Sequence, residues 1–515
     1  MASDATNPTG SESPGGPHKS HAGRSGNGPS RRDFLRSLGA GGAGLLVGTG
    51  GLPSLLTACD GPTGPSRIPP LERNPLRLAP EVAPQGLTLV AEEGTAGFGG
   101  GVEGPAWLLN ESLPSPLLRV RRGDPFQVVL ENRLPQDVIL HWHGLAPPAD
   151  MDGHPRYAVG TGGEYRYAFT VEDRAGTYWY HSHTHMRTAE QTYRGVAGLL
   201  IVEDDEEEAL GLPSGDREIP VILQDRRVDA AGVPYYQPFG PDRMAGYMGP
   251  EPFGNGIRRP RVDADSALYR LRVLNGSNAR IFRLGRSDGQ SLILVGNDGG
   301  LIDRSRALSY VDLGPAERAD LLVDLSGTGE GDRVMLRSLS FSVPGGAGFM
   351  GGANLQGQPL DLLEFRVTRR IEEPAVIPDE LSTVPGPNPE DAVRERTFRF
   401  TSEMMNHRIN GRSFQMDRID EVVPFDETEA WSFVNDSFLP HPVHLHATHF
   451  RVISRSGGRS QVMPWEAGGK DTVLLHPFET VRVAVRFTAH RGLFLLHCHN
   501  LEHEDMGMMA NILVE

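Results

Sequence analysis

The sequence predicts an all-β protein of three consecutive β-sandwich domains, and three observations support this fold class. The chain has 63 glycines and 41 prolines, which favours short strands joined by tight turns over long helices. Apolar and polar residues alternate through short segments such as 118–130 and 269–273, and a period of two is typical of half-buried strands. The length of 515 residues allows about three domains at ~150 residues each.

Two segments divide the chain into these domains. One is the acidic run from Glu203 to Glu208, which is most simply a solvated connector. The other is a stretch from Pro374 to Pro389 that contains several prolines. The predicted order is a signal segment at 1–59, a linker at 60–75, a first domain at 76–208, a second domain at 209–373, a linker at 374–392 and a third domain at 393–515.

The charge balance limits the partners that the protein can have. The formal net charge of −16 argues against a nucleic-acid partner, because binding to phosphate groups needs a basic surface. The charge itself most simply serves solubility. We expect a monomer that acts on small molecules.

The first residues of the chain predict an export signal. Residues 1–29 are rich in Gly, Ser, Pro and Asn, a composition typical of disorder. Arg31 and Arg32 then precede a weakly apolar, glycine-rich stretch at 38–56, which resembles a twin-arginine export signal. A membrane anchor is the alternative, but so many glycines make a poor spanning helix. We therefore expect the protein in the periplasm or cell envelope.

The signal segment ends in a candidate lipidation site. Leu56-Thr57-Ala58-Cys59 resembles a bacterial lipobox, in which the cysteine becomes the lipidated first residue of the mature protein. Ordinary cleavage after small residues, with an incidental cysteine, is the alternative. We expect a lipid anchor to the membrane at Cys59.

Histidines are distributed very unevenly along the chain. From composition alone, 18 histidines would form roughly 0.6 His-x-His pairs, whereas the sequence contains five. They are His141/His143, His181/His183, His183/His185, His444/His446 and His497/His499. No histidine occurs between His185 and His407, so the first and third predicted domains hold every candidate imidazole ligand.

The spacing of these pairs gives them a common geometry. On a strand, residues i and i+2 point to the same face, about 6.6 Å apart. Each His-x-His strand therefore presents two imidazoles to one side, and the residue between them (Trp142, Ser182 or Leu445) points to the other. Two such strands from each outer domain supply eight imidazoles. If the outer domains meet, these imidazoles can surround a small group of metal ions.

The segment Leu496-His497-Cys498-His499 joins two different metal sites. Cys498 is the residue between two histidines, so its sulfur must leave the opposite face of the strand. His441, His503 and Met508 lie upstream and downstream. Two imidazoles, a thiolate and a weak thioether form the ligand set of a blue copper site. Zinc prefers four strong ligands, and calcium and magnesium do not select imidazole or thiolate.

The remaining histidines are most simply hydrogen-bonded or surface residues. They are His18, His21, His154, His185, His407, His449, His476 and His490.

Four motifs resemble the copper-binding motifs of multicopper oxidases. They are His141-Trp142-His143-Gly144, Tyr178-Trp179-Tyr180-His181-Ser182-His183, His441-Pro442-Val443-His444-Leu445-His446 and His497-Cys498-His499-Asn500-Leu501-Glu502-His503. The segment 313–320 resembles the middle domain of the same family, and 499–509 is most similar to bacterial copper-efflux oxidases and spore-coat laccases. The resemblance covers essentially the whole chain after the signal segment.

This resemblance implies three cupredoxin-like Greek-key domains and four copper ions. The implied ligands are His441, Cys498, His503 and the axial Met508 for type 1 copper, His141 and His444 for type 2 copper, and His143, His181, His183, His446, His497 and His499 for the type 3 pair. One departure is Ala447, where the family usually has glycine. Because it touches no ligand, we expect only a small backbone adjustment there.

The implied activity couples one-electron oxidation of a substrate to reduction of dioxygen to water. Type 1 copper receives each electron, which crosses through Cys498 to the histidines on either side. Asp152 and Glu504 occupy positions that resemble the carboxylates assigned to proton delivery, and burial is expected to raise their pKa toward neutrality. The simpler alternatives are a turn residue for Asp152 and a solvated charge for Glu504.

The substrate and two rival functions remain open at this stage. A laccase-like enzyme would oxidise phenols, whereas a metallo-oxidase would oxidise Cu(I), Fe(II) or Mn(II). The 14 methionines form no dense cluster outside 506–509, which weakens the cuprous alternative. The glycine-rich stretch at 345–357 either lines a substrate pocket or is a flexible loop. A non-catalytic envelope scaffold would lack the copper ligands, and a copper nitrite reductase would not have four His-x-His pairs.

The signal segment generates the first prediction. Replacing Arg31 and Arg32 by lysine should leave the protein in the cytoplasm, because the export system reads the arginine pair. Cys59→Ala should release the exported protein from the membrane fraction, because no lipid chain can be attached. Cell fractionation with immunoblotting measures both outcomes. Membrane association that persists in Cys59→Ala would contradict the lipid anchor.

Overall fold

A computed structural model of the chain describes residues 72–343 and 355–515. The predicted signal segment, the lipobox and most of the glycine-rich stretch at 345–357 lie outside these residues. Among the helices described, none has the length and apolar character needed to cross a bilayer.

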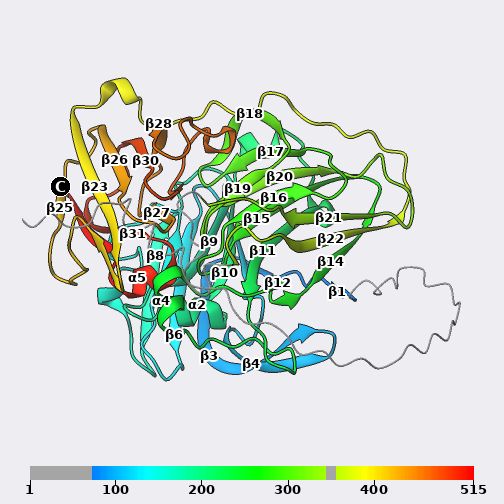
Figure 1. Cartoon of the computed structure of the whole chain (residues 1–515), viewed down its shortest axis with the longest axis horizontal. Coiled ribbons are helices and arrows are strands. Elements are labelled where there is room, and N and C mark those ends of the chain that lie inside the picture. Colours follow the sequence, from blue (N-terminus) through cyan, green and yellow to red (C-terminus); the bar gives the residue numbers. More distant parts are fainter. Residues whose placement is uncertain (1–71, 344–354) are drawn as a thin grey trace, which may run out of the picture. The chain divides into compact units, whose positions relative to one another are not determined.

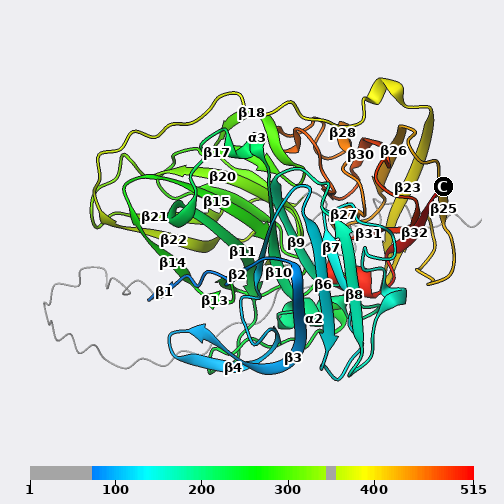
Figure 2. The same cartoon turned by 180° about the vertical axis from the view of Figure 1, so that it is seen from behind.

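The all-β prediction is confirmed, because strands in six sheets make up most of the regular secondary structure of the described chain (Figures 1 and 2). The first segment forms two sheets. One has the order β2 (Glu81–Val82), β5 (Leu117–Arg121), β10 (Ala197–Glu203), β9 (Gly176–Ser182) and β7 (Leu140–His143), and the other has the order β4 (Val102–Leu109), β3 (Gln85–Gly99), β6 (Pro125–Asn132) and β8 (Glu164–Thr170). Short helices η1 (Pro155–Tyr157) and α2 (Thr188–Arg194) follow β7 and β9.

The middle segment forms a seven-stranded sheet and, together with β1 from before the first segment, a six-stranded sheet. The first has the order β13 (Ile257–Arg258), β12 (Glu251–Gly254), β11 (Glu218–Arg226), β15 (Leu268–Asn275), β20 (Arg318–Asp324), β17 (Leu292–Asn297) and β18 (Gly300–Leu308). The second has the order β1 (Asn74–Pro75), β14 (Pro260–Asp265), β22 (Leu360–Arg369), β21 (Arg333–Ser338), β16 (Phe282–Arg286) and β19 (Val311–Leu313). Its helices are α3 (Asp205–Glu208), η2 (Gly215–Arg217) and α4 (Gly240–Ala245).

The last segment forms two five-stranded sheets. One has the order β24 (Asn406–Ile409), β23 (Arg394–Glu403), β26 (Glu429–Asn435), β30 (Thr480–Val485) and β28 (Arg451–Ser456), and the other has the order β25 (Glu421–Val423), β32 (Met509–Val514), β31 (Gly492–Cys498), β27 (His441–Leu445) and β29 (Thr472–Leu475). Its helices are η5 (Pro389–Asp391), η6 (Pro464–Glu466) and α5 (Leu501–Asp505).

The residues between the paired histidines anchor the strands in the sandwich cores, as the alternation predicts. Trp142 lies in the core of the first pair of sheets, where its ring meets Phe126 edge to face at 4.6 Å between centroids. Leu445 and Cys498 lie together in the core of the last pair. Because neighbouring residues on a strand point to opposite faces, the flanking histidines must leave these cores on the other side.

The acidic run is more than a solvated connector, which corrects the sequence interpretation. Asp204 caps α3 by accepting a hydrogen bond from the backbone N–H of Glu207, 2.9 Å away. The Glu207 carboxylate is buried and accepts hydrogen bonds from Arg270 at 2.9 Å and Arg272 at 2.5 Å. A buried carboxylate needs such partners to offset its desolvation, and the arginines come from β15, far along the sequence.

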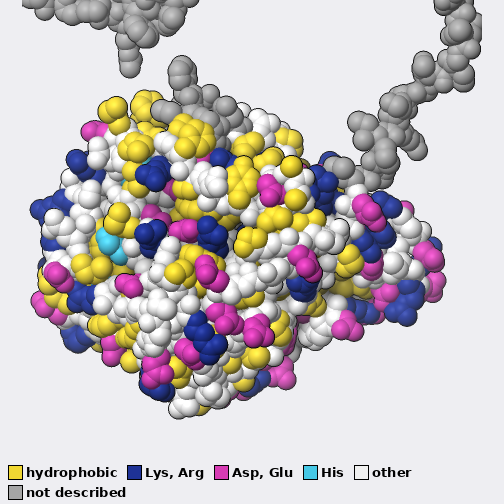
Figure 3. Space-filling model, turned by 90° about the horizontal axis from the view of Figure 1, so that it is seen from below, with side chains coloured by type: hydrophobic (Ala, Val, Ile, Leu, Met, Phe, Trp, Pro, Cys, Tyr) yellow, Lys and Arg dark blue, Asp and Glu magenta, His cyan; other side chains and the backbone are white. Residues whose placement is uncertain are grey.

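Charged side chains are mixed on the face of the molecule shown in Figure 3. Basic and acidic groups alternate over the described part of this face, and neither sign gathers into one continuous region. A surface of this kind serves solubility.

Candidate metal centre

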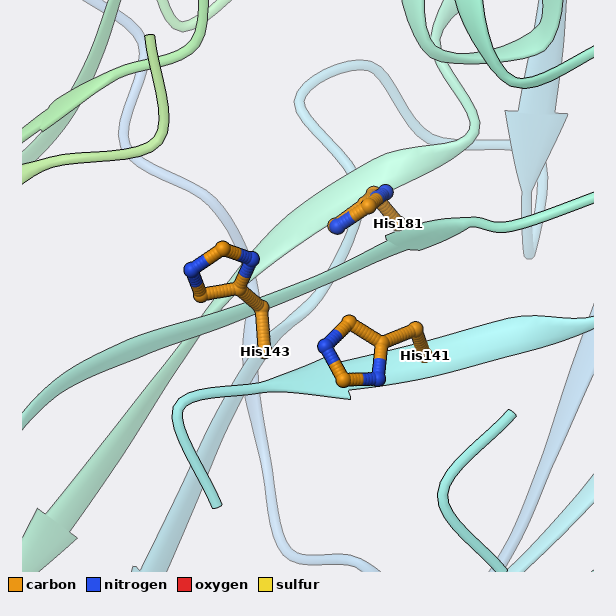
Figure 4. A group of neighbouring side chains, drawn as sticks. All are labelled: His141, His143 and His181. Atoms are coloured by element: carbon orange, nitrogen blue, oxygen red, sulfur yellow. The ribbon is translucent and has the colours of Figure 1, made fainter. Parts of the chain in front are cut away.

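Eight imidazoles from the first and last segments form one buried group, called here the imidazole cluster. Strands β7, β9, β27 and β31 each bring two of them, on the strand or just beyond its end. Figure 4 shows the rings of His141 and His143 from β7 and of His181 from β9 converging on one space. The members are His141, His143, His181, His183, His444, His446, His497 and His499, all buried.

Several donor nitrogens of the imidazole cluster face one another. His141 Nε2 lies 3.3 Å from His444 Nε2, so the first and last segments meet at this point. His497 Nε2 lies 3.1 Å from His446 Nε2 and 3.4 Å from His183 Nε2. A second trio has ring centroids 5.1–5.6 Å apart: His143, His181 and His499.

The outer nitrogens determine which nitrogen of each ring carries the proton. His141 Nδ1–H donates to the Asp152 carbonyl at 2.7 Å, and His444 Nδ1–H donates to the Asp471 carbonyl at 2.9 Å. Since a carbonyl can only accept, both Nε2 atoms carry lone pairs. His143 is reversed, because its Nε2 meets the Asp471 carboxylate at 3.1 Å and its Nδ1 has no described partner. Each of these rings therefore directs a lone pair into the cluster.

Burial keeps six of the eight imidazoles uncharged at neutral pH. It lowers the pKa of His444 to about 3. Desolvation also lowers the pKa of His143, His181, His183, His446 and His499 well below the usual histidine value. Protons therefore do not satisfy the inner lone pairs of these six rings at neutral pH. Metal cations can, and a set of neutral imidazoles suits copper, so the residues present fit the copper ions that the sequence implies.

The second group, called here the thiolate site, lies on the core side of β31. Cys498 Sγ is 3.3 Å from His441 Nδ1 and 3.7 Å from His503 Nδ1. The two Nδ1 atoms are 3.2 Å apart. Met508 is buried in the same core as Cys498. The structure thus brings together the two imidazoles and the thiol that the sequence assigned to a blue copper site, and places Met508 in the same core.

The chemistry of the thiolate site also favours a bound cation. Burial raises the pKa of the Cys498 thiol, and burial lowers the pKa of His441 to about 3. An apolar pocket thus favours the neutral thiol, whereas a metal ion stabilises the thiolate. The outer nitrogens are already committed: His503 Nε2–H donates to the Met244 carbonyl at 2.9 Å, and His441 Nε2 meets Ser437 Oγ at 2.9 Å.

Both carboxylates singled out in the sequence contact imidazoles of the cluster. Asp152 Oδ2 lies 2.6 Å from His446 Nδ1. Glu504, on α5, has Oε2 3.2 Å from His497 Nδ1 and Oε1 3.7 Å from His183 Nδ1. Glu504 is buried, so the alternative of a solvated charge is wrong.

The expected upward shift for Glu504 is also wrong. Burial raises the pKa of Glu504, but the neighbouring His497 and His183 lower it by a larger amount, to about 2. Glu504 is therefore ionised in the metal-free chain, and its negative charge faces the outer nitrogens of both rings.

Comparisons with known proteins identify the family. Models of multicopper oxidase domains match residues 90–207 and 387–515. A multicopper oxidase of Staphylococcus aureus is 30% identical over 432 residues, which are 83% of this chain and 88% of the relative. The chain belongs to the multicopper oxidase family.

Solved structures agree with this assignment and extend the cupredoxin-like fold to the whole described chain. The multicopper oxidase McoA of Aquifex aeolicus superposes with a TM-score of 0.79 at 31% identity, covering 86% of this chain and 100% of that one. The cell division protein FtsP of Dickeya dadantii is 30% identical over 94% of this chain and 98% of the relative. Relatives of this multicopper oxidase therefore carry names from more than one functional class.

The middle segment contributes to the centre through an ion pair that the sequence analysis did not find. Arg318, on β20, donates from both arms of its guanidinium to the Asp471 carboxylate, with Nη1 to Oδ1 at 2.8 Å. Asp471 in turn contacts His143. Arg318 also donates to the Thr177 carbonyl at 2.9 Å. One buried side chain of this multicopper oxidase thus connects all three segments, although the middle one holds no candidate ligand.

The residues after two His-x-His pairs differ in how much space they have. Gly144 has φ +93°, and a Cβ there would lie 2.7 Å from Arg318 Nη2 and 2.8 Å from Asp471 Oδ2. Ala447 has φ +59° and packs its methyl group into the core of the last segment. Glycine is thus needed at 144, whereas alanine at 447 is accommodated in the left-handed conformation.

This contrast predicts that exchanging glycine and alanine lowers stability at position 144 and has little effect on stability at position 447. Gly144→Ala should lower the free energy of unfolding by about 2–5 kcal/mol, the sum of left-handed strain and overpacking. Ala447→Gly should stay within about 1 kcal/mol of the native protein, because relief of strain offsets the added entropy of the unfolded chain. Denaturant unfolding of the copper-free proteins measures both. Equal stability of the two variants would contradict the argument.

Proposed function

We propose that this multicopper oxidase is a laccase-like enzyme that oxidises phenolic or other aromatic substrates one electron at a time and reduces dioxygen to two waters. Family membership supports an oxidoreductase that binds copper and uses dioxygen. The observation that carries the substrate class is a pair of exposed aromatic rings close to the thiolate site, Phe438 and Phe478.

The aromatic pair has the features of a binding surface. Phe438 is 66% exposed and Phe478 is 49% exposed, and their rings meet edge to face at 4.8 Å between centroids. Phe438 directly follows Ser437, whose hydroxyl contacts His441. Phe478 has φ +61°, a strained conformation for a bulky residue that is often found at functional sites. Exposed aromatic rings can pack against the ring of a phenol.

A metal-ion substrate is the second candidate, and a different observation favours it. Met404 and Met405 are exposed at the turn between β23 and β24, and thioethers select Cu(I) over harder ions. Relatives bear names from both classes. One is a laccase of Bacillus subtilis at 28% identity over 78% of this chain, and another is a structure from Campylobacter jejuni described as a metallo-oxidase, at 25% identity with a TM-score of 0.74.

We also propose four copper ions with the ligands that the resemblance implies. Type 1 copper would be held by His441, Cys498, His503 and Met508, type 2 copper by His141 and His444, and the type 3 pair by His143, His181, His183, His446, His497 and His499. When bound, copper supplies one-electron redox chemistry, taking electrons singly and passing four to dioxygen. The chain orients the donor atoms, because hydrogen bonds on the outer nitrogens fix the rings.

Cys498 is proposed to join the two sites. Its sulfur faces His441 and His503 in the thiolate site. Its neighbours in sequence, His497 and His499, belong to the imidazole cluster. The backbone on either side of Cys498 is therefore a covalent path one residue long between the two sites.

A scaffold function, as the names of the FtsP relatives suggest, fits the chain less well. A scaffold needs no converging donors, whereas here ten buried imidazoles and Cys498 form two groups. Burying so many polar atoms without partners costs free energy, which metal binding would offset.

We also propose export to the cell envelope and lipid anchoring at Cys59, on the sequence pattern alone.

The proposed function predicts colour and a substrate order. Copper-loaded protein should be blue, because thiolate-to-copper charge transfer colours type 1 sites, and it should oxidise a phenol faster than Cu(I), Fe(II) or Mn(II). Cys498→Ser should be colourless and inactive with all four. Absorption spectra, copper analysis and steady-state rates measured side by side provide the test. A colourless wild type with full copper content contradicts the type 1 assignment, and faster turnover of a metal ion favours the metallo-oxidase.

Glu504 and Asp152 are proposed to relay the four protons that dioxygen reduction consumes, and Glu504, which is ionised in the metal-free chain, takes up each proton before passing it on. Glu504→Gln should keep the blue colour, the copper content and the rate of type 1 reduction, because the amide oxygen can still orient His497. Reoxidation by dioxygen should slow by about 10-fold or more, the lower range for a positioned acid or base. Stopped-flow reoxidation of the reduced variant measures this, with Asp152→Asn alongside. Native reoxidation rates in both variants would show that these residues only orient the rings.

A further inference from the structure

Among the lone histidines that lie in the described residues, His407 is the one that packs against the thiolate site. It lies on β24 and is buried. Its ring stacks on the ring of His503, with centroids 4.0 Å apart and planes inclined by 22°. The sequence alone predicts only a hydrogen-bonded or surface role for His407. The structure adds a face-to-face contact with a proposed copper ligand.

Hydrogen bonds hold His407 in one orientation. Its Nε2–H donates to the Arg243 carbonyl at 3.2 Å. Since a carbonyl only accepts, Nδ1 carries the lone pair and accepts a hydrogen bond from the Ser402 hydroxyl at 2.8 Å. Both ring nitrogens are therefore occupied, and His407 has no nitrogen free to bind a metal ion itself.

The stack constrains a rotation that the other contacts of His503 leave open. His503 directs Nδ1 toward Cys498 and donates from Nε2 to the Met244 carbonyl at 2.9 Å. Both contacts lie in the plane of the ring, so neither presses on its faces. His407 covers one face, and the ring of His441 approaches at 5.0 Å with a 56° inclination. A flat neighbour at 4.0 Å resists tilting and excludes water from that face.

We propose that His407 is a positioning residue of the type 1 site, which fixes the plane of the His503 imidazole by stacking and so helps to set the copper potential. The proposal rests on His503 being a type 1 ligand, as in the proposed function. Residues around the ligands tune metal affinity, and solvent access tunes the potential. Opening a space beside His503 would admit water, which favours the more highly charged Cu(II).

The experiment compares His407→Ala with His407→Phe in the copper-loaded full-length protein. His407→Ala should lower the type 1 potential, change its hyperfine coupling in electron paramagnetic resonance and weaken type 1 copper binding by roughly 10–100-fold. His407→Phe keeps a flat ring without the hydrogen bonds, and it should restore potential and spectrum to nearly native values. His154→Ala is the matched control, because His154 is also buried and hydrogen-bonded, at 2.9 Å to Asn511, without stacking on a proposed ligand.

The possible results distinguish a failure of the proposed role of His407 from a failure of the assignment of His503 as a type 1 ligand. A native potential and spectrum in His407→Ala, beside a blue wild type, overturn the proposal. Equal changes in His407→Ala and His407→Phe also overturn it, because the stack would then not be what matters. If His503→Ala retains the native blue spectrum, the ligand assignment fails, and the inference fails with it.

Discussion

Lone pairs on buried imidazole nitrogens are the constraint on which the rest of the structure depends. The outer nitrogens of six of the eight rings meet carbonyls or carboxylates, as between His141 and Asp152 or His444 and Asp471. The inner ones then face one another at 3.1–3.4 Å. Desolvation prevents protonation, and no described donor reaches the inner atoms of His181 and His499. Bound cations would satisfy them, and the surrounding sheets must hold the rings in place against this cost.

Strand geometry and one ion pair together hold the imidazole rings in place. Alternation along each strand directs Trp142, Leu445 and Cys498 into the sandwich cores and the flanking histidines to the opposite side. Strands β7 and β27 come from different pairs of sheets, so their alignment depends on contacts between segments. Arg318 supplies such a contact, because it joins the middle segment to Asp471 beside the cluster. Removing one partner of a buried ion pair typically costs about 3–5 kcal/mol. Loss of Arg318 or Asp471 would therefore disturb the alignment of the segments.

Local pattern was sufficient for much of the fold and for the donor groups. Period-two spacing and family motifs predicted the all-β fold and a set of histidines that the structure brings together with Cys498. Contacts that depend on distant segments could not be predicted. Arg318 and Asp471 are 153 positions apart, and the stack of His407 on His503 joins strand β24 to helix α5. The ionisation of Glu504 follows from two neighbouring imidazoles rather than from burial alone, and the partners of Glu207 lie on β15.

The division of the cluster between two ends of the described chain has a consequence for how the protein is made. Strands β7 and β9 are synthesised long before β27 and β31, and an entire pair of sheets lies between them. A growing chain therefore exposes histidines that could hold any divalent ion weakly, and it lacks the thiolate site altogether. Selection of the metal is deferred until the last strands have docked, so the folded, metal-free protein is the form that must discriminate among ions. Until metal ions bind, the buried cores of the protein must supply its stability.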